Sequence, residues 1–369
     1  MLQAQVDTNP ASSRPDADAA PQTRIRELDG WRAISVLLVI LHHVFSIQYP
    51  DLVQPSYFYL LWHILGLAGF LGVDTFFVIS GFVICRLLIM EESRLGSVSL
   101  KGFYYRRVFR ILPPLFVYLG FLALMIATGL IQERWTSLAI AASFLYDLNF
   151  LPSSWFLGHT WSLAVEEQFY LLFPTIWVLC RRRWRGLVFA LAFFACIAWN
   201  VSLMLSKDQN PVVDARTRAG FACICFGVLM AIFEPRVRSI ARRVPGFVVL
   251  ILALILLVHP VPSWAVIGVL YSAMIMPPAI GLVLMYSVEN RGRFSAFLCS
   301  RPVQAVGLTS YGIYLWQQPL TGPITLYSRL PVAPPLLLPL LCVVVPLSYF
   351  FVEKPAMRLG KRLSRGVRK

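Results

Sequence analysis

The sequence predicts an all-α membrane protein, a helical bundle of about ten transmembrane helices with both termini in the cytoplasm. The 369 residues are 58% hydrophobic and only 14% charged, and the mean hydropathy is +0.68. Soluble domains are roughly half apolar and a quarter charged. The surplus of apolar residues comes in long blocks separated by short basic clusters. Long apolar blocks of this kind are typical of transmembrane helices.

Ten blocks are candidates for membrane spans, although some are short or interrupted. Pro277, Pro278 and Pro346 fall inside blocks, where neighbouring helices of a packed bundle can satisfy the freed backbone groups. The predicted spans are residues 31–48, 70–90, 111–131, 161–180, 186–204, 218–234, 246–260, 265–287, 303–326 and 334–352.

The ends of the chain are polar. Residues 1–23 form a tail rich in Pro, Ala and Asp, which we expect to be flexible and which lacks the apolar core of a signal peptide. A single membrane domain is expected over 24–360, followed by a basic tail at 361–369. The connections 49–69 and 132–160 are long and aromatic, which favours interfacial helices or re-entrant segments.

The distribution of charge predicts the orientation. Of the 33 Lys and Arg residues, 26 lie in the tails and in alternate loops that the ten spans place on one side, and 5 lie on the other. Basic loops stay in the cytoplasm, so both termini are predicted there. The net charge of +15 does not indicate nucleic-acid binding, because the basic residues form short clusters between apolar blocks. Membrane lipids are the expected surroundings.

The seven cysteines do not predict a disulfide framework or a metal centre. Nearly all lie within apolar blocks or at their inner ends, and the count is odd. We interpret them as small buried residues.

Arg32 and His43 lie on one face of the first span, because eleven residues make about three helical turns. Arg32 is then near the cytoplasmic surface and His43 deeper in the membrane. Neutral imidazole can accept and donate a proton, which favours a functional His43. The alternatives are a snorkelling Arg32 and a His43 that only joins helices by a hydrogen bond.

Glu166 and Tyr170 share one face of the fourth span, at about the depth expected for His43. A carboxylate that holds an imidazole makes an activated base, so the sequence predicts a Glu166–His43 pair. The alternative is a Glu166 that faces external water. Asp74 is a further buried acid, and in the same span Gly72, Ser80 and Gly81 are interpreted as helix-packing residues.

Arg107 and Arg110 are three residues apart on one face of a helix start. Paired guanidinium groups suit phosphate recognition through bidentate hydrogen bonds. This stretch taken alone favours an ordinary positive cytoplasmic loop.

Together these residues resemble acyltransferase family 3, the multipass inner-membrane acyltransferases that modify bacterial cell-surface glycans and some small molecules. The resemblance runs from about residue 24 to about 360. It is carried by Arg32-x10-His43, Arg107-x-x-Arg110 and Glu166-x-x-Phe-Tyr170, and by FLGVDTFFVISGFVI, SYGIYLWQQPL and FVEKP in the same order. One departure is Gln317, where relatives often have His. Some relatives carry a further hydrolase-like domain after the bundle, and we expect none here.

The resemblance implies a multi-pass protein of the bacterial inner membrane that uses acyl-CoA, usually acetyl-CoA, as donor substrate, with no permanently bound cofactor. The acceptor it implies is a sugar hydroxyl. Arg32, Arg107 and Arg110 would hold the CoA phosphates, and His43 with Glu166 would deprotonate the acceptor hydroxyl. Asp74, Tyr170, Tyr311 and Tyr314 would support the site. If the position of Gln317 carries a proton relay in relatives, we expect none in this chain.

Two other classes stay open. A solute transporter would use the buried His, Glu and Asp residues as a proton relay without consuming acyl-CoA. A non-catalytic scaffold of glycan assembly would not need His43 or Glu166. The sequence does not indicate the acceptor, the acyl group, the presence of a covalent intermediate or the oligomeric state.

Overall fold

The computed structural model describes residues 24–48, 59–148, 154–205, 215–258, 271–328 and 334–367. All regular elements within these ranges are helices, and one isolated β-bridge joins Ile131 to Tyr327. The predicted all-α fold is confirmed.

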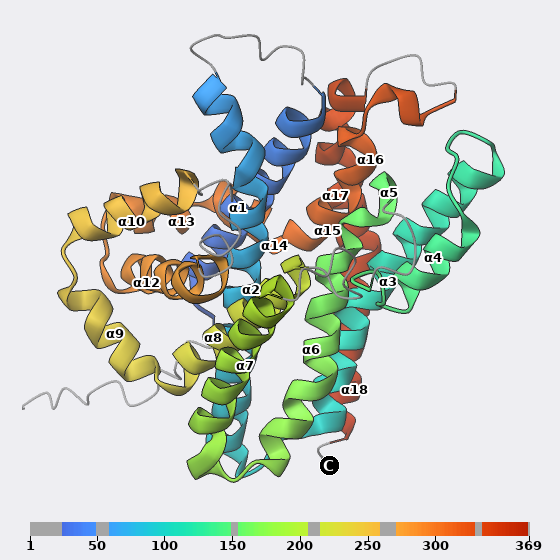
Figure 1. Cartoon of the computed structure of the whole chain (residues 1–369). Coiled ribbons are helices and arrows are strands. Elements are labelled where there is room, and N and C mark those ends of the chain that lie inside the picture. The colour runs from blue at the N-terminus through green and yellow to red at the C-terminus, as the bar shows by residue number, and fades with distance from the viewer. Residues whose placement is uncertain are drawn as a thin grey trace, which may run out of the picture.

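The helices follow one another along the chain as a bundle with short helical connections (Figure 1). They are α1 Arg26–Gln48, α2 Tyr59–Leu95, α3 Leu100–Ala127, α4 Trp135–Ala142, α5 Trp155–Gly158, α6 Thr160–Leu179, η2 Arg182–Trp184, α7 Arg185–Leu205, α8 Ala215–Ile232, α9 Glu234–Arg243, α10 Gly246–Val258, η3 Tyr271–Ile275, α12 Met276–Glu289, α13 Arg293–Leu298, α14 Arg301–Leu308, α15 Ser310–Trp316, α16 Gln318–Thr321, η4 Ile324–Leu326, η5 Pro334–Leu340, α17 Leu341–Ser348, η6 Tyr349–Glu353 and α18 Lys354–Gly366.

Helix α2 is the central element of the bundle. Its 37 residues pass through the middle of the molecule, with α9, α10, α12 and α13 to one side and α3, α6 and α18 to the other (Figure 1). It packs extensively against α1 and α8. A Cβ atom added at Gly72 would overlap the Ser35 carbonyl oxygen, and one at Gly81 would overlap the Ile224 carbonyl oxygen. The packing role predicted for Gly72 and Gly81 is therefore confirmed.

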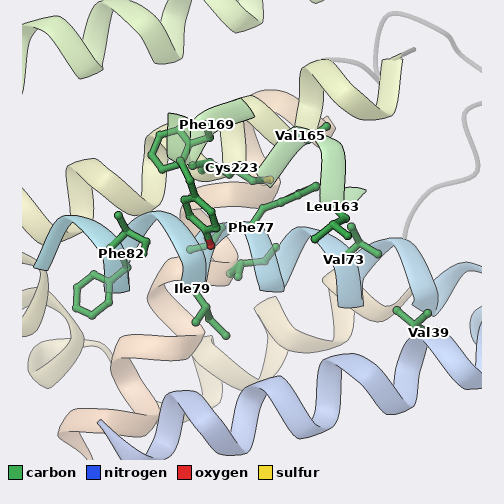
Figure 2. Close-up of a cluster of buried hydrophobic side chains, with 14 of the residues drawn as sticks. Val39, Val73, Phe77, Ile79, Phe82, Leu163, Val165, Phe169 and Cys223 are labelled. Atoms are coloured by element: carbon green, nitrogen blue, oxygen red, sulfur yellow. The ribbon is translucent and has the colours of Figure 1, made fainter. Parts of the chain in front are cut away.

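The hydrophobic core lies where α1, α2, α6 and α8 meet. Figure 2 shows Val39 of α1, Phe77 of α2, Phe169 of α6 and Cys223 of α8 pointing into the same buried region. All seven cysteines are free thiols, and the predicted burial is found for Cys85, Cys223 and Cys225, whereas Cys342 is exposed.

Six helices of the described residues are long and apolar enough to cross a membrane. A seventh candidate is the pair Thr217–Ile232 and Glu234–Arg243, which bends by 92°. The bend comes at Phe233, where Pro235 begins the next helix. The shorter apolar helix Gly246–Leu257 and helix α6 also coincide with predicted spans. A multi-pass membrane protein is thus supported, whereas the count of about ten spans stays a prediction.

The predicted span 303–326 differs most from the structure. It comprises parts of four short helices, α14, α15, α16 and η4, in place of one continuous helix. The breaks fall at Thr309, Gln317 and Gly322, and Pro319 begins α16. Proline lacks the amide that would continue the preceding helix. Tyr311 and Tyr314 reach the interior from α15, and Gln317 reaches it from the break between α15 and α16.

The two long aromatic connections also contain helix. Residues 59–69 of the first connection extend α2 at its N-terminal end, and residues 49–58 lie outside the described residues. The second connection holds α4 and α5. Both connections thus contain helix, and the predicted interfacial or re-entrant position of these segments stays a prediction.

Close packing of α2 against α8 can be tested at Gly227 on α8. A Cβ atom there would overlap the Val78 carbonyl oxygen of α2. Because overpacking forces the backbones apart, we expect Gly227→Ala to destabilise the protein by about 1–3 kcal/mol. The thermal midpoint of the purified protein in nanodiscs measures this effect.

Gly120→Ala on α3 is the matched control, since a Cβ atom there meets nothing within 4 Å. Alanine should raise helix stability by about 0.5–1 kcal/mol at such a position. Equal midpoints for the two variants would contradict the close approach of α2 and α8.

Candidate active site

One cavity, here called the arginine cavity, brings together seven of the nine residues that the sequence singled out. It has a volume of about 90 Å³ and lies between α1, α2, α3, α6 and α15. Val73, Phe76 and Phe77 supply part of its apolar wall. The predicted residues that line it are Arg32, Arg107, Arg110, Glu166, Tyr170, Tyr311 and Tyr314.

Helical spacing explains how the arginines converge. Arg107 and Arg110 are one turn apart on α3, so both face the cavity, whereas Arg106 turns aside to pair with Glu91 at 2.9 Å and to donate to Ser364 at 2.7 Å. Arg32 enters from α1, with Asp29 of the same helix 3.9 Å away. The two predicted motifs therefore form one site.

Glu166 is the only acidic side chain among the residues that line the arginine cavity. Its carboxylate accepts hydrogen bonds from the hydroxyl groups of Ser80 and Tyr170. The Arg107 guanidinium lies over the Tyr170 ring, 4.6 Å from its centroid. Three guanidinium groups thus face one carboxylate, and this surplus of positive charge favours an anionic ligand.

A second cavity, here called the histidine cavity, contains His43. Its volume is about 270 Å³, and its walls come from α1, α2, α6 and the segment between α4 and α6. Polar and aromatic groups alternate around it. They include His42, His43, Asp147, Trp155, His159, Tyr314 and Gln318.

The His43 ring is held by Gln317, the residue at which this chain departs from the pattern of its relatives. Nδ1 of His43 lies 2.9 Å from Oε1 of Gln317. Nε2 of Gln317 donates to Oε1 of Gln318 at 2.8 Å, and Nε2 of Gln318 donates to the Trp155 carbonyl at 2.7 Å. The chain of amides leaves Oε1 of Gln317 as an acceptor. His43 therefore carries its proton on Nδ1, and Nε2 is the basic nitrogen.

The predicted Glu166–His43 pair is replaced by two separate sets of contacts. Glu166 is bound by Ser80 and Tyr170 in the arginine cavity, while the partner of the His43 ring is Gln317 in the histidine cavity. Depth along two helices could be estimated from the sequence, but the rotation of each helix could not. The carboxylate faces the guanidinium groups, where it neutralises charge.

Asp74 also departs from its expected place. It does not line the arginine or the histidine cavity, and it lies beside Cys223 of α8 across the α2–α8 contact. Its observed contact is thus with a packing neighbour, away from Glu166 and His43.

The two cavities share two wall residues, Val73 and Tyr314. The Tyr314 hydroxyl donates to the His159 carbonyl at 3.0 Å and lies 2.6 Å from the Ser162 hydroxyl. Tyr314 therefore stands between the arginines and His43 and is anchored to α6. The sequence predicted Tyr314 as a supporting residue of the site, but it did not indicate that Tyr314 lies between the two cavities.

A third hollow, here called the groove, adjoins the histidine cavity through Ser154 and Trp155. Its volume is about 810 Å³. It lies between the segment that follows α3 and the segment around η4, and its lining includes Gln132, Glu133 and Tyr327. The Trp155 ring lies 5.3 Å from the His43 ring, centroid to centroid. The groove, the histidine cavity and the arginine cavity therefore follow one another.

Sequence reasoning missed Gln317, Ser80, Trp155 and His159 as site residues. Ser80 was interpreted as a packing residue, and Trp155 and His159 were treated only as part of the aromatic connection 132–160. The available signal was His159, two residues before the WSLAVEEQFY segment. Among the described residues, no group of three or more His, Cys, Asp or Glu is placed to hold a metal ion.

Comparison with known proteins identifies the family. The model of acyltransferase family 3, described as an acyltransferase domain, matches residues 25–353, and the chain belongs to this family. Of the residues that carried the resemblance, Arg32, Arg107, Arg110, Glu166 and Tyr170 line the arginine cavity and His43 lines the histidine cavity.

Two similar relatives are named as O-acetyltransferases. The O-acetyltransferase OatA of Staphylococcus aureus strain NCTC 8325 is 28% identical over 372 residues, and a putative O-acetyltransferase of strain COL is 29% identical over 381 residues. Each match covers 90% of this chain and 57% of the relative, so the chain spans just over half the length of these proteins. No solved structure matches the chain.

Asp147, in the histidine cavity, gives a test by pH. Burial raises the pKa of the Asp147 carboxyl, to which Gln168 donates at 2.8 Å. The pKa of this carboxyl is therefore higher in the folded state than in the unfolded state, where it is about 3.9. As the pH rises above that value, the carboxyl ionises more readily in the unfolded state, so the free energy of unfolding decreases. Asp147→Asn keeps an acceptor oxygen without the charge, so we expect its thermal midpoint to exceed that of the wild type near pH 7.

The advantage of Asp147→Asn should vanish on acidification to about pH 4, where the wild-type carboxyl is also neutral. Midpoints recorded at both pH values test this. A variant that is less stable than the wild type at neutral pH would show that the carboxylate is stabilised by its surroundings.

Proposed function

We propose that this chain is a membrane-embedded O-acyltransferase that moves an acyl group, here an acetyl group, from cytoplasmic acyl-CoA to a hydroxyl of a glycan, a lipid-linked sugar or a similar acceptor. The observation that carries the proposal is the contact of the arginine cavity with the histidine cavity at Val73 and Tyr314. A site for an anionic donor thus adjoins a site that contains a neutral base. Family membership and the names of the relatives support the acyl-transfer class.

The proposal includes an arrangement in the membrane. About ten spans within the domain 24–360 would cross a bacterial inner membrane, with both termini in the cytoplasm. The excess of Lys and Arg in the alternate loops and in the tails supports this orientation. The arginine cavity would then open toward the cytoplasm and the groove toward the outside.

The donor would bind by its phosphates at the mouth of the arginine cavity. Arg32, Arg107 and Arg110 supply charge-assisted donors for phosphate oxygens. Because the cavity is narrow, only the slender arm of CoA would extend past the arginines, with its thioester directed to Tyr314 and His43. Glu166 would balance the arginines when the donor is absent and fix the Tyr170 ring beneath Arg107.

The chemistry would take place at His43. Nε2 accepts the proton of the acceptor hydroxyl as its oxygen attacks the thioester carbonyl carbon, and the carbon–sulfur bond then breaks. The imidazolium returns the proton to the departing thiolate, which leaves as the free thiol of CoA. Gln317 stabilises the protonated ring through its Nδ1 hydrogen bond. Direct transfer needs no covalent acyl-enzyme.

Loss of the two arginines of α3 tests donor binding. Arg107→Ala with Arg110→Ala should raise the KM for acetyl-CoA, because each charge-assisted hydrogen bond contributes about 1.5–3 kcal/mol, or roughly tenfold to a hundredfold in binding. The kcat should change less. Release of free thiol at rising acetyl-CoA concentration measures both constants.

Arg106→Ala is the control, since Arg106 pairs with Glu91 and Ser364 and does not line the cavity. Its donor KM should match that of the wild type. An unchanged KM in the double variant would remove Arg107 and Arg110 from the donor site.

His43→Ala tests the reaction itself. Removal of a general base costs about 10²–10⁴ in rate, so CoA release by the variant in nanodiscs should fall to that extent while donor binding remains. Full activity of a folded His43→Ala protein would sink the mechanism. A folded wild type that consumes no acyl-CoA would redirect attention to a solute transporter, whose assay is solute flux.

A further inference from the structure

His159 is a buried histidine whose ring makes no hydrogen bond to the described part of the chain. Only 5% of the residue is exposed, and both ring nitrogens, Nδ1 and Nε2, are buried without a partner. An unsatisfied buried polar group costs about 1–3 kcal/mol. A native structure retains such a group for a reason, and a ligand that completes its hydrogen bonds is one such reason.

The ring of His159 is held firmly and borders the histidine cavity. Its ring centroid lies 5.6 Å from that of Tyr118 and 5.4 Å from that of Tyr314, both edge to face. Its carbonyl accepts hydrogen bonds from Ser162 and Tyr314. The backbone and both ring faces are thus fixed, so the imidazole is oriented before any ligand arrives.

Trp316 provides a comparison within the same aromatic cluster. Its Nε1 is also buried without a partner, and its ring lies 5.6 Å from the Tyr118 ring. Trp316 lines none of the three hollows described above, whereas His159 lines the histidine cavity together with His43. Among the described residues, His159 is therefore the residue that lines one of these hollows and also carries buried nitrogens without a partner.

The chemistry of the ring matches a hydroxyl group. Burial favours neutral imidazole, which has one donor and one acceptor nitrogen. A hydroxyl group can donate a hydrogen bond to the unprotonated ring nitrogen, or it can accept one from the N–H of the other ring nitrogen. Around the same cavity, Asp147 and Gln318 offer polar groups and Trp155 offers an apolar ring face. A compact molecule with several hydroxyl groups and an apolar face, such as a sugar ring, fits this lining.

We propose that His159 is an acceptor-binding residue, which hydrogen-bonds a hydroxyl of the sugar in the histidine cavity while His43 removes the proton from the hydroxyl that is acylated. This inference rests on the proposed function and adds to it the class of acceptor and the residue that holds it. His43 has its ring orientation set by Gln317 for proton transfer, whereas both ring nitrogens of His159 are buried without a hydrogen-bond partner, so a ligand hydroxyl would meet them only after a small shift of the cavity wall.

The test compares variants in a strain of the source bacterium that lacks the gene. The measured quantity is alkali-labile acetate on the surface glycans, normalised to the amount of variant protein in the membrane. His159→Phe fills the same space without nitrogens, so it should accumulate normally and lower the acetate roughly tenfold or more. His159→Gln keeps a donor and an acceptor but places them differently from the two ring nitrogens, so its acetate should lie between that of His159→Phe and that of the wild type.

The control is Trp316→Phe, which removes an equally buried, unpaired N–H and should restore wild-type acetate. A second readout is the rise in thermal midpoint on adding CoA to each purified variant, which should be unchanged because His159 lies away from the arginine cavity. If His159→Phe does not accumulate, the comparison of His159→Gln with Trp316→Phe decides.

The outcomes separate the two proposals. Wild-type acetate with His159→Phe, or with His159→Gln if only that variant accumulates, would overturn the role of His159 and leave the acyltransferase intact. A loss of CoA binding together with acetate would assign His159 a structural role and also overturn the proposal. If the wild-type gene itself restores no acetate to the deletion strain, the O-acetyltransferase function fails, and the inference fails with it.

Discussion

The convergence of three arginine side chains on a cavity lined by a single carboxylate is the constraint on which the site depends. Arg32, Arg107 and Arg110 come from two helices, and Glu166 reaches them from a third. Guanidinium groups in a membrane bundle are costly unless they are paired or carry function. Ser80 and Tyr170 fix the carboxylate, so the packing of α2 and α6 determines where the charge lies. The surplus positive charge is what makes this end of the bundle fit for an anionic donor.

As a consequence of this arrangement, the charged groups of the arginine cavity are separate from the candidate base, His43. Because Glu166 is occupied on the arginine side, His43 takes its orientation from an amide chain that runs from Gln317 through Gln318 to the Trp155 carbonyl. Tyr314, anchored to the His159 carbonyl, forms part of the wall between the two regions. Donor recognition and proton transfer can then be altered independently, and the acceptor region continues into the groove past Trp155.

The sequence predicted the fold class and most of the site, since apolar blocks and helical spacing depend only on local order. Arg107 and Arg110 share a face by spacing alone, and the packing glycines Gly72 and Gly81 were identified by their small size. The rotation of one helix against another is not local, so the Glu166–His43 pair was wrong. The break of 303–326 at Gln317 was likewise missed, and with it the contact from Gln317 to His43.

The most direct test of the account is a structure of the protein with an acetyl-CoA analogue whose sulfur is linked to the acyl group through an extra methylene, so that it cannot transfer. We expect the phosphates beside Arg107 and Arg110, the arm of CoA along the arginine cavity, and the acyl carbonyl near Tyr314 within reach of Nε2 of His43. An analogue bound outside the arginine cavity, or with its acyl end directed away from His43, would contradict a transfer path through these two cavities.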